Sequence, residues 1–391
     1  MKKILHITNR LVIGGPSRHV AMLAKAQQLN YEVKVVGGSA APGEVLALDL
    51  FAELKHQPIR IPELSRKLSL SRDYRVYRKL RQIIHEFQPD IVHTHTAKVG
   101  ALGRYAAMKE GVPKIIHTYH GLIFENYFSK MLSKSLIKLD RYLASISDAI
   151  IVLSQNQQNA LVDDFAICPK DKSYIVPLAI DVDEFQYNDE TRKLFRHQYN
   201  LSSETIAIGI LGRLVPIKNI KLFLDGIYYL KNHSKIDIRA FIIGDGVEKE
   251  KLINYAQSLG LNTTQDFESN MDAQLVFTSW FKHMKTIYSG LDIIALTSKS
   301  EGTPMSLMEA QSARRAVIAA DVGGVCDIIQ NHDTGLLFNV ELREDFFAKL
   351  KLLVESQDLR TKISLQAETY ARKYYALDLM LHRINTIYEN E

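Results

Sequence analysis

Two series of short β-branched runs, each alternating with longer segments of helical periodicity, run through this sequence of 391 residues. This alternation is typical of parallel βαβ units. The strands predicted in the first series are 3–8, 32–36, 90–95, 114–120, 149–154 and 173–179. Those predicted in the second series are 205–212, 238–244, 274–277, 292–298 and 316–321. The pattern therefore predicts an α/β protein with two Rossmann-like, doubly wound parallel-sheet domains.

The segment between the two series, 181–203, is polar and has no clear period, so we place the domain boundary there. The predicted domains are a first Rossmann-like domain at 1–182 and a second at 190–375. A last helical segment, about 376–391, could pack back on the first domain. Doubly wound sheets bind ligands beyond the carboxyl ends of their strands, so two facing sheets predict a cleft for a nucleotide and an acceptor.

The composition favours a cytoplasmic protein. No apolar run approaches the roughly 18 residues that a membrane span needs. Residues 1–5 imitate the start of a signal peptide, but Asn9 and Arg10 interrupt the apolar stretch and no small-residue cleavage site follows. The two cysteines, Cys168 and Cys326, fit a reducing compartment and provide neither a disulfide framework nor a zinc-binding spacing.

Positive charge is concentrated in the first half of the chain. Residues 1–180 contain 25 Lys and Arg against 15 Asp and Glu, whereas residues 181–391 contain 24 against 29. Eight basic residues fall between Arg60 and Arg81. This balance favours an anionic partner, and a solvated helix face is the alternative. We expect no nucleic acid as a partner, because no recognition motif or interleaved aromatic platform accompanies the charge.

The segment 127–143, YFSKMLSKSLIKLDRYL, combines apolar side chains at helical spacing with four basic residues. Basic amphipathic helices of this kind can lie on anionic membrane surfaces. A helix that faces the core with a solvated outer side gives the same pattern. Both interpretations stay open on the sequence alone.

Gly14 and Gly15 follow the first predicted strand and precede an apolar helical run that begins at Val20. Paired glycines allow the backbone to approach a ligand closely, and the start of a helix favours a phosphate. A tight turn between strand and helix needs the same glycines. The three-glycine dinucleotide fingerprint is not met, which argues against an NAD-dependent dehydrogenase.

Arg213 and Lys218 follow the first strand of the second series and precede an apolar helix. Lys218 at a helix start opposes the helix dipole, at a cost of about 0.3–1 kcal/mol that a purely structural position would avoid. Two fixed cations can neutralise a diphosphate leaving group, Arg213 by bidentate contact and Lys218 as a point charge. The alternative is two surface cations on a loop.

The segment from Glu301 to Glu309 directly follows the strand predicted at 292–298. Thr303 suits an N-cap and Pro304 the first helical position, so the free amides of this helix would face the cleft. Glu309 would lie roughly 7–8 Å along the helix axis, so the two carboxylates could hold different hydroxyls. The structural alternatives are Glu301 as a partner of the helix dipole and Glu309 as a solvated helix residue.

Histidines recur in or just after the strands of the first series. They are His6, His93, His95, His117 and His120. His93 and His95 share a strand face and could hold zinc with a third ligand. We expect no metal, because no Cys or carboxylate stands at matching spacing beside them.

Taken in order, these motifs resemble those of the retaining glycosyltransferases of family 4, which have the GT-B architecture, over essentially the whole chain. The resemblance implies that Gly14 and Gly15 adjoin the donor diphosphate, that Arg213 and Lys218 bind it, and that no metal is needed. The remaining roles that it implies are Glu309 on the ribose hydroxyls, Glu301 on the transferred sugar, His120 beside the reacting centre, and Gly302, Thr303, Pro304 and Met305 lining the sugar pocket.

Two positions depart from the family pattern. Ser279 stands where a glycine commonly precedes Trp280, which leaves the selectivity for the nucleotide base open. Arg314 stands where a glycine usually closes the helix of Glu309. Since glycine adopts the left-handed conformation most easily, we expect that loop to be built differently.

The expected activity is transfer of a hexose or N-acetylhexosamine, with retention, from a nucleotide-diphosphate sugar. We expect a UDP-sugar rather than a GDP-sugar as donor, no cofactor, and a lipid-linked or other glycan as acceptor. The expected context is bacterial O-antigen, capsule or exopolysaccharide synthesis, at the inner face of the cytoplasmic membrane. A sugar-nucleotide epimerase of the same architecture and a non-catalytic nucleotide-sugar-binding protein remain the alternatives.

Overall fold

A computed structural model describes residues 1–391 except 13, 41–45, 66–67, 122–129, 282–283 and 391. The chain divides into two compact units, Met1–Leu178 with Asp378–Glu391, and Ala179–Leu377. The first stretch of the first unit thus ends four residues before position 182, where the sequence placed its end. The reason is local pairing, because the Ile180 N–H donates to the Tyr375 carbonyl at 3.0 Å and Ile180 bridges Ala376, both in the second unit.

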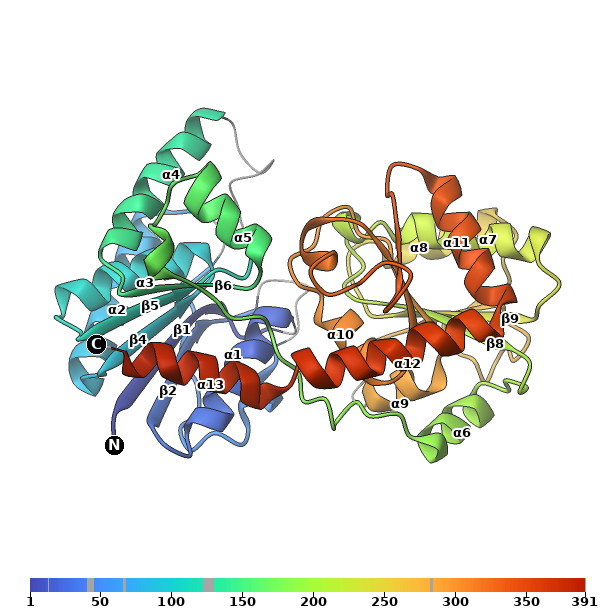
Figure 1. The fold of residues 1–391 in the computed structure, drawn as a ribbon, viewed down its shortest axis with the longest axis horizontal. Coiled ribbons are helices and arrows are strands. Elements are labelled where there is room, and N and C mark those ends of the chain that lie inside the picture. Colours follow the sequence, from blue (N-terminus) through green and yellow to red (C-terminus); the bar gives the residue numbers. More distant parts are fainter. Residues whose placement is uncertain (13, 41–45, 66–67, 122–129, 282–283, 391) are drawn as a thin grey trace. The chain divides into compact units, whose positions relative to one another are not determined.

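The first unit is built on a parallel sheet of seven strands in the order β3-β2-β1-β4-β5-β6-β7 (Figure 1). Its strands are β1 (Lys3–Arg10), β2 (Glu32–Gly38), β3 (Ile59–Ile61), β4 (Ile91–His95), β5 (Lys114–Thr118), β6 (Ala149–Val152) and β7 (Ser173–Ile175). Its helices are α1 (Gly15–Gln27), α2 (Leu70–Phe87), α3 (Ala97–Lys109), α4 (Lys130–Ser145), α5 (Gln155–Asn159) and α13 (Leu377–Glu389). The predicted parallel α/β sheet is confirmed.

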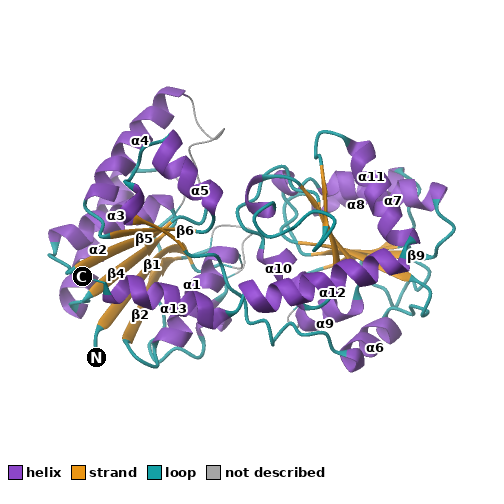
Figure 2. Cartoon of the chain, viewed as in Figure 1, coloured by secondary structure: helices purple, strands orange, loops and turns teal. Residues whose placement is uncertain are grey.

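Helices cover both faces of this sheet (Figure 2). Leu5 and Val92 lie on one face and pack in a buried cluster with residues of α2 and α3. Since side chains alternate along a strand, His6 and His93 point to the opposite face. There His6 contacts Gln27 of α1 and His93 contacts Tyr388 of α13.

The second unit contains another parallel sheet of seven strands, in the order β10-β11-β9-β8-β12-β13-β14. Its strands are β8 (Ile206–Leu211), β9 (Ile238–Ile243), β10 (Thr263–Thr264), β11 (Leu275–Thr278), β12 (Ile293–Leu296), β13 (Ala316–Ala320) and β14 (Leu336–Phe338). Its helices are α6 (Asp189–Gln198), α7 (Ile220–His233), α8 (Lys249–Ser258), α9 (Met284–Gly290), α10 (Met305–Ser312), α11 (Arg343–Glu355) and α12 (Gln357–Tyr374). A buried cluster formed by α7, α8 and α11 lies on one face of the sheet.

Helix α6 lies in the segment that the sequence analysis treated as lacking regular structure. Asn188 caps it, with its Oδ1 accepting the Thr191 N–H at 2.8 Å. Only Phe195 and Arg196 of the helix are buried, so it carries no apolar stripe from which a helical period could be detected.

Each sheet has a position where the strand order reverses. In the first unit it lies between β1 and β4, and in the second between β8 and β12. In open α/β sheets, ligands bind outside the carboxyl ends of the strands at this switch point. The loops that follow β1, β8 and β12 carry residues that the sequence analysis assigned to a site.

No helix in the described part of the chain combines the length and the apolar character needed to cross a membrane.

Candidate active site

Lys218 and Glu301 meet at the switch point of the second unit. Lys218 follows β8 and Glu301 follows β12, the strand next to it in the sheet. Lys218 Nζ donates to Glu301 Oε1 at 2.5 Å, and Ser298 Oγ donates to the same oxygen at 2.5 Å. Two residues that the sequence assigned to different parts of a donor, the diphosphate and the sugar, thus form one charge-assisted pair.

The sequence analysis expected Lys218 to begin a helix, but it does not. It ends a short 3₁₀ turn, Pro216–Lys218, and α7 begins at Ile220 after Asn219, which has φ of 49°. The Lys218 carbonyl accepts a hydrogen bond from Thr297 Oγ1 at 3.2 Å. The ammonium therefore lies outside the helix and has a carboxylate partner, which relieves the conflict with the helix dipole.

Arg213, the other cation that the sequence assigned to the leaving group, is partly buried. Its loop lies beside the Lys218 side chain, since a Cβ on Gly212 would be 3.7 Å from Lys218 Cε. In the ranges that the structure describes, no carboxylate lies within salt-bridge distance of the Arg213 guanidinium. Gly212, directly before it, has φ of 145°, and Gly244 has φ of 140°. A Cβ on Gly244 would lie 2.0 Å from the Gly212 carbonyl oxygen, so glycine is required where these two loops meet.

The loop of Glu301 leads into α10, which begins at Met305. Pro304 is the N-cap, with extended ψ of 103° and no side-chain capping bond, so the predicted N-cap at Thr303 is one residue early. The error follows from the ψ of Pro304, because proline fixes φ in the helical range but leaves ψ free.

A pair of glycines that the sequence analysis missed holds the backbone of this loop. The Gly324 N–H donates to the Glu301 carbonyl at 3.2 Å. Gly323 has φ of 52°, and a Cβ there would lie 2.0 Å from the same oxygen. The available signal was the position of these two glycines just after a predicted strand.

Glu309 is a buried carboxylate and not a solvated helix residue, because only 1% of it is exposed. Tyr288 of α9 donates its hydroxyl to Glu309 Oε2 at 2.6 Å. The tyrosine orients the carboxylate. A carboxylate held this way accepts hydrogen bonds, which is the chemistry needed to hold hydroxyls.

The loop after α10 closes in the usual way, contrary to the expectation from Arg314. Arg314 itself adopts the left-handed conformation, with φ of 56°. The Arg315 N–H donates to the Ala310 carbonyl at 2.9 Å and the Arg314 N–H to the Gln311 carbonyl at 3.0 Å. These two bonds form a Schellman motif. The loop therefore has the usual hydrogen bonds, and Arg314 adopts the left-handed conformation at a cost in free energy.

In the first unit, Gly14 and Gly15 stand at the start of α1. Gly15 is the first residue of the helix and Gly14 its N-cap, with extended backbone (φ of 163°). A Cβ built on Gly14 would have no atom within 4 Å. Neither the conformation nor the packing at Gly14 requires glycine, and its missing side chain leaves open space before the helix amides.

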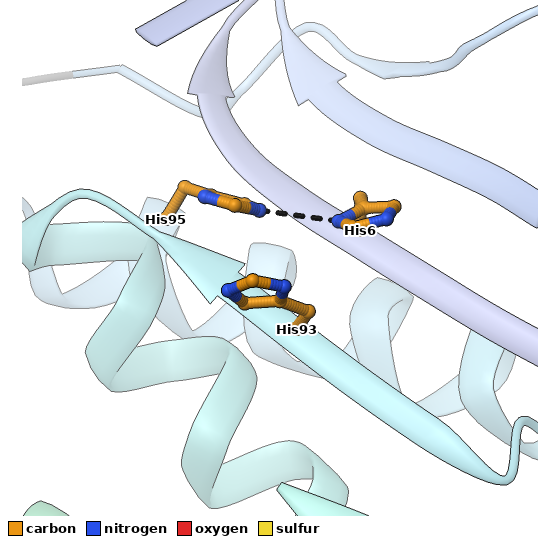
Figure 3. A group of neighbouring side chains, drawn as sticks. All are labelled: His6, His93 and His95. Atoms are coloured by element: carbon orange, nitrogen blue, oxygen red, sulfur yellow. Dashed lines mark hydrogen bonds between the residues drawn. The ribbon is translucent and has the colours of Figure 1, made fainter. Parts of the chain in front are cut away.

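Histidines gather at the switch point of the first unit. His6 of β1 and His93 and His95 of β4 lie together, with His6 Nδ1 and His95 Nε2 3.1 Å apart (Figure 3). His120, two residues beyond β5, is half-buried and places its Nε2 3.2 Å from His95 Nδ1. His117 lies apart from this chain of contacts, against Thr94 Oγ1 at 2.8 Å.

Burial sets the protonation of these histidines. It lowers the pKa of His6 to about 4, although the hydrogen bond to Gln27 opposes the effect. Burial also lowers the pKa of His120 to about 4 and that of His95 well below its ordinary value. The imidazoles are therefore neutral at pH 7, and each has one N–H and one lone pair.

Both halves of the chain match models of known protein families. Residues 13–184 match the model described as Glycosyltransferase Family 4, and residues 191–370 match the one described as Glycosyl transferases group 1.

Two curated relatives are similar over about three quarters of the chain. The UDP-Gal:alpha-D-GlcNAc-diphosphoundecaprenol alpha-1,3-galactosyltransferase of Escherichia coli is 27% identical over 76% of this chain and 75% of that protein. The amylovoran biosynthesis glycosyltransferase AmsD of Erwinia amylovora is 26% identical over 73% of this chain and 75% of its own length.

Among solved structures, Anabaena HepE in complex with UDP-glucose has a TM-score of 0.80 against this chain. The comparison covers 100% of both chains at 18% sequence identity, and it shows a shared fold.

Proposed function

Because the chain belongs to glycosyltransferase family 4 and has the GT-B fold, we propose that it transfers a hexose or N-acetylhexosamine with retention from a nucleotide-diphosphate sugar to a glycan acceptor. The observation that carries this proposal is the group at the β8 and β12 switch point. Arg213, a cation without a carboxylate partner in the described chain, lies in the same loop after β8 as Lys218 of the Lys218–Glu301 pair.

In this proposal the donor exchanges partners with the ion pair. Lys218 leaves Glu301 for the diphosphate, and Glu301 then accepts hydrogen bonds from hydroxyls of the transferred sugar. Arg213 adds a bidentate contact to the departing phosphate. These fixed charges stabilise the leaving group, so the donor chemistry needs no metal and no cofactor.

The rest of the donor is assigned by family resemblance and supported by local geometry. Glu309, oriented by Tyr288, holds the ribose hydroxyls. Gly14 and Gly15 adjoin the diphosphate, consistent with the open space over Gly14. The segment Gly302, Thr303, Pro304 and Met305 lines the sugar pocket.

The acceptor is presented by the first unit, with His120 beside the reacting centre. Among the described residues of the site, the carboxylates Glu301 and Glu309 are assigned to donor hydroxyls and not to the anomeric carbon, so we propose a front-face route. The acceptor oxygen forms the new bond to the anomeric carbon on the side from which the phosphate departs. The hydroxyl proton passes to the leaving phosphate oxygen.

A UDP-sugar is the proposed donor and a lipid-linked glycan the proposed acceptor. Support comes from the relatives, since the name of the E. coli enzyme specifies UDP-Gal and a diphosphoundecaprenol acceptor, and HepE was solved with UDP-glucose. The proposed context is bacterial O-antigen, capsule or exopolysaccharide assembly, for which the amylovoran enzyme is a further precedent.

We propose that α4 brings the first unit to the inner face of the cytoplasmic membrane. Leu143 faces the interior, whereas Lys134 and Lys138 are exposed beside Leu139 and Tyr142, each 48% exposed. Cations beside exposed apolar side chains fit an anionic lipid surface. Residues 127–129 of the predicted amphipathic segment lie outside the described residues.

Flotation with liposomes tests the membrane part of the proposal. The protein should float with vesicles that contain anionic lipid, and Lys134→Glu with Lys138→Glu should abolish flotation. Binding that does not depend on anionic lipid would contradict it. Exchange of Lys235 and Lys251 in the second unit for Glu provides a matched control for the charge change.

Incubation with a panel of UDP- and GDP-sugars, with and without a lipid-linked disaccharide acceptor, tests the reaction. Transfer should require the acceptor, and NMR of the product should show the anomeric configuration of the donor. An epimerase would convert the donor in the absence of acceptor. A binding protein would gain thermal stability with the donor but form no product.

A further inference from the structure

Helix α1 brings a further histidine, His19, to the cluster in the first unit. His19 is 2% exposed, and neither of its ring nitrogens has a hydrogen-bond partner among the described residues. Its ring centroid lies 5.0 Å from that of His120 and 5.8 Å from that of His95. A buried imidazole without a partner loses its hydration and gains no hydrogen bond in return. Binding of a ligand to the His19 ring nitrogens would offset this cost.

The spacing of these three rings matches that of a metal site. One ligand nitrogen from each of His19, His95 and His120 lies within 4.8 Å of the other two. His95 Nδ1 and His120 Nε2 are 3.2 Å apart. Two nitrogens at about 2.0–2.1 Å from a tetrahedral ion are about 3.3–3.4 Å apart, so this pair already has nearly the required separation. We propose that His19, His95 and His120 bind a divalent transition-metal ion of the zinc type, with a fourth position open to solvent.

The hydrogen bonds behind His95 orient it for this role. Gln27 Oε1 can only accept, so the bond of 2.7 Å to His6 Nε2 places the proton of His6 on that nitrogen. His6 Nδ1 then accepts from His95 Nε2 at 3.1 Å. The lone pair of His95 is thereby left on Nδ1, the nitrogen that faces His120. Supporting bonds of this kind orient metal-binding histidines.

The neighbouring triad His6, His93 and His95 does not make an equivalent site, although its rings are as close. His93 contacts the Tyr388 hydroxyl at 2.6 Å through Nδ1 and Thr118 Oγ1 at 2.7 Å through Nε2. Both nitrogens of His6 are engaged as well. That triad is a buried, hydrogen-bonded network, whereas His19 contributes two unused nitrogens.

Sequence spacing does not reveal that a helix residue lies beside two strand ends, and the proposed metal site therefore differs from the expectation of no metal. It is independent of the donor chemistry, which uses residues of the second unit. A bound ion would occupy the lone pair of His120 Nε2. Because the proposed function places His120 beside the reacting centre, the ion should inhibit transfer, and this expectation rests on the proposed function.

Direct metal binding by the full chain, prepared without a histidine tag, tests the site. We expect one equivalent of Zn²⁺ by calorimetry and, with Co²⁺, the intense visible absorption of a tetrahedral ion. Exchange of Gln27 for Leu should weaken binding about 10–100-fold, and His19→Ala at least as much. The control His197→Ala, at an exposed position of α6, should bind as the wild type.

Absence of a stoichiometric binding event, or unchanged affinity in His19→Ala, would overturn the proposal and assign the unpaired nitrogens to buried water. If His19→Ala fails to fold, His120→Ala, at a half-buried position, gives the same test. Binding without inhibition of transfer would leave the metal site standing and argue against a role of His120 at the reacting centre.

Discussion

Lys218 and Glu301 neutralise one another at 2.5 Å, so Arg213 carries the positive charge that remains in this group of residues. A departing diphosphate should depend on that charge most. Replacing Arg213 with Ala is expected to lower turnover at saturating donor by about 10²- to 10³-fold. The matched control is Lys235→Ala, an exposed cation of the same unit, which should turn over as the wild type. Unchanged turnover in the Arg213 variant would remove it from the leaving-group assignment.

Arg314 offers a test of stability that is separate from activity. Its left-handed backbone, with φ of 56°, costs about 1–2 kcal/mol in a residue with a side chain, and glycine largely avoids that cost. Arg314→Gly should therefore stabilise the second unit by about 0.5–1 kcal/mol, measured as a shift of the urea midpoint at constant slope. Arg314→Ala keeps the strained backbone and should give no gain. A glycine variant less stable than the wild type would show that the contact of Arg314 with Glu368 at 3.9 Å matters more.

The site residues that follow strand ends could be predicted from the sequence. Arg213 and Glu301 follow predicted strand ends, and the carboxyl edge of a parallel sheet collects such residues. The bond from Tyr288 to Glu309 could not be predicted, because it joins two helices whose relative rotation is set only by packing. His19 lies on a helix face whose neighbours the sequence does not specify, so its contact with the strand histidines was equally hidden.

At the scale of elements, the turn after β13 positions the loop that carries Glu301. Gly323→Ala would place a Cβ 2.0 Å from the Glu301 carbonyl oxygen, so that loop must shift. The affinity for UDP or a UDP-sugar should fall about tenfold or more, measured by calorimetry. Gly260→Ala is a matched control, since Gly260 also has positive φ but nothing within 4 Å of its Cβ position.

The two glycine variants separate backbone strain from the displacement of the loop. Both should lose about 1 kcal/mol of stability from the left-handed conformation alone. Only Gly323→Ala should lose donor affinity. Equal affinities in the two variants would mean that the Gly323 turn does not hold the site.

Eleven strands lie where the sequence predicted them, including the three-residue β7, but β3, β10 and β14 were missed. Buried β-branched runs of four or more residues identify the central strands of both sheets, whereas β3 and β14 have three residues each and β10 has two. Such segments are strands because their backbones pair with a neighbouring strand. This pairing is a tertiary interaction that the local sequence pattern does not reveal. Helix starts were displaced for a similar reason, since turns at Pro216–Lys218 and Pro304 are set by the adjoining loops.

At the scale of the whole molecule, the two units should differ in their response to acid. The histidines His6, His19, His93, His95, His117 and His120 of the first unit have lowered pKa values. In the unfolded chain they regain a pKa near 6.5, so between about pH 6.5 and 4 the unfolded state binds more protons. The stability that neutral histidines provide is complete above this window and is lost as the pH falls through it. For His6 alone, the shift to about 4 corresponds to roughly 3 kcal/mol.

The single tryptophan makes this difference measurable. Trp280 lies in the second unit, which buries no histidine among its described residues. On lowering the pH from 7 to 4.5 in dilute urea, circular dichroism should report loss of the first unit before the fluorescence of Trp280 changes. Coincident transitions by both probes would contradict an acid-sensitive first unit. A repeat at pH 8, above the window, should show the two units unfolding without that separation.

The last helix has a consequence for the synthesis of the protein. Helix α13 packs on the first sheet, with Tyr388 against His93 and the Tyr388 carbonyl accepting from Lys114 Nζ at 3.0 Å. The ribosome makes these residues after every strand of both sheets has been translated. The second unit can therefore fold before α13 has packed on the first unit. The first unit is then completed last, although most of its residues are synthesised first.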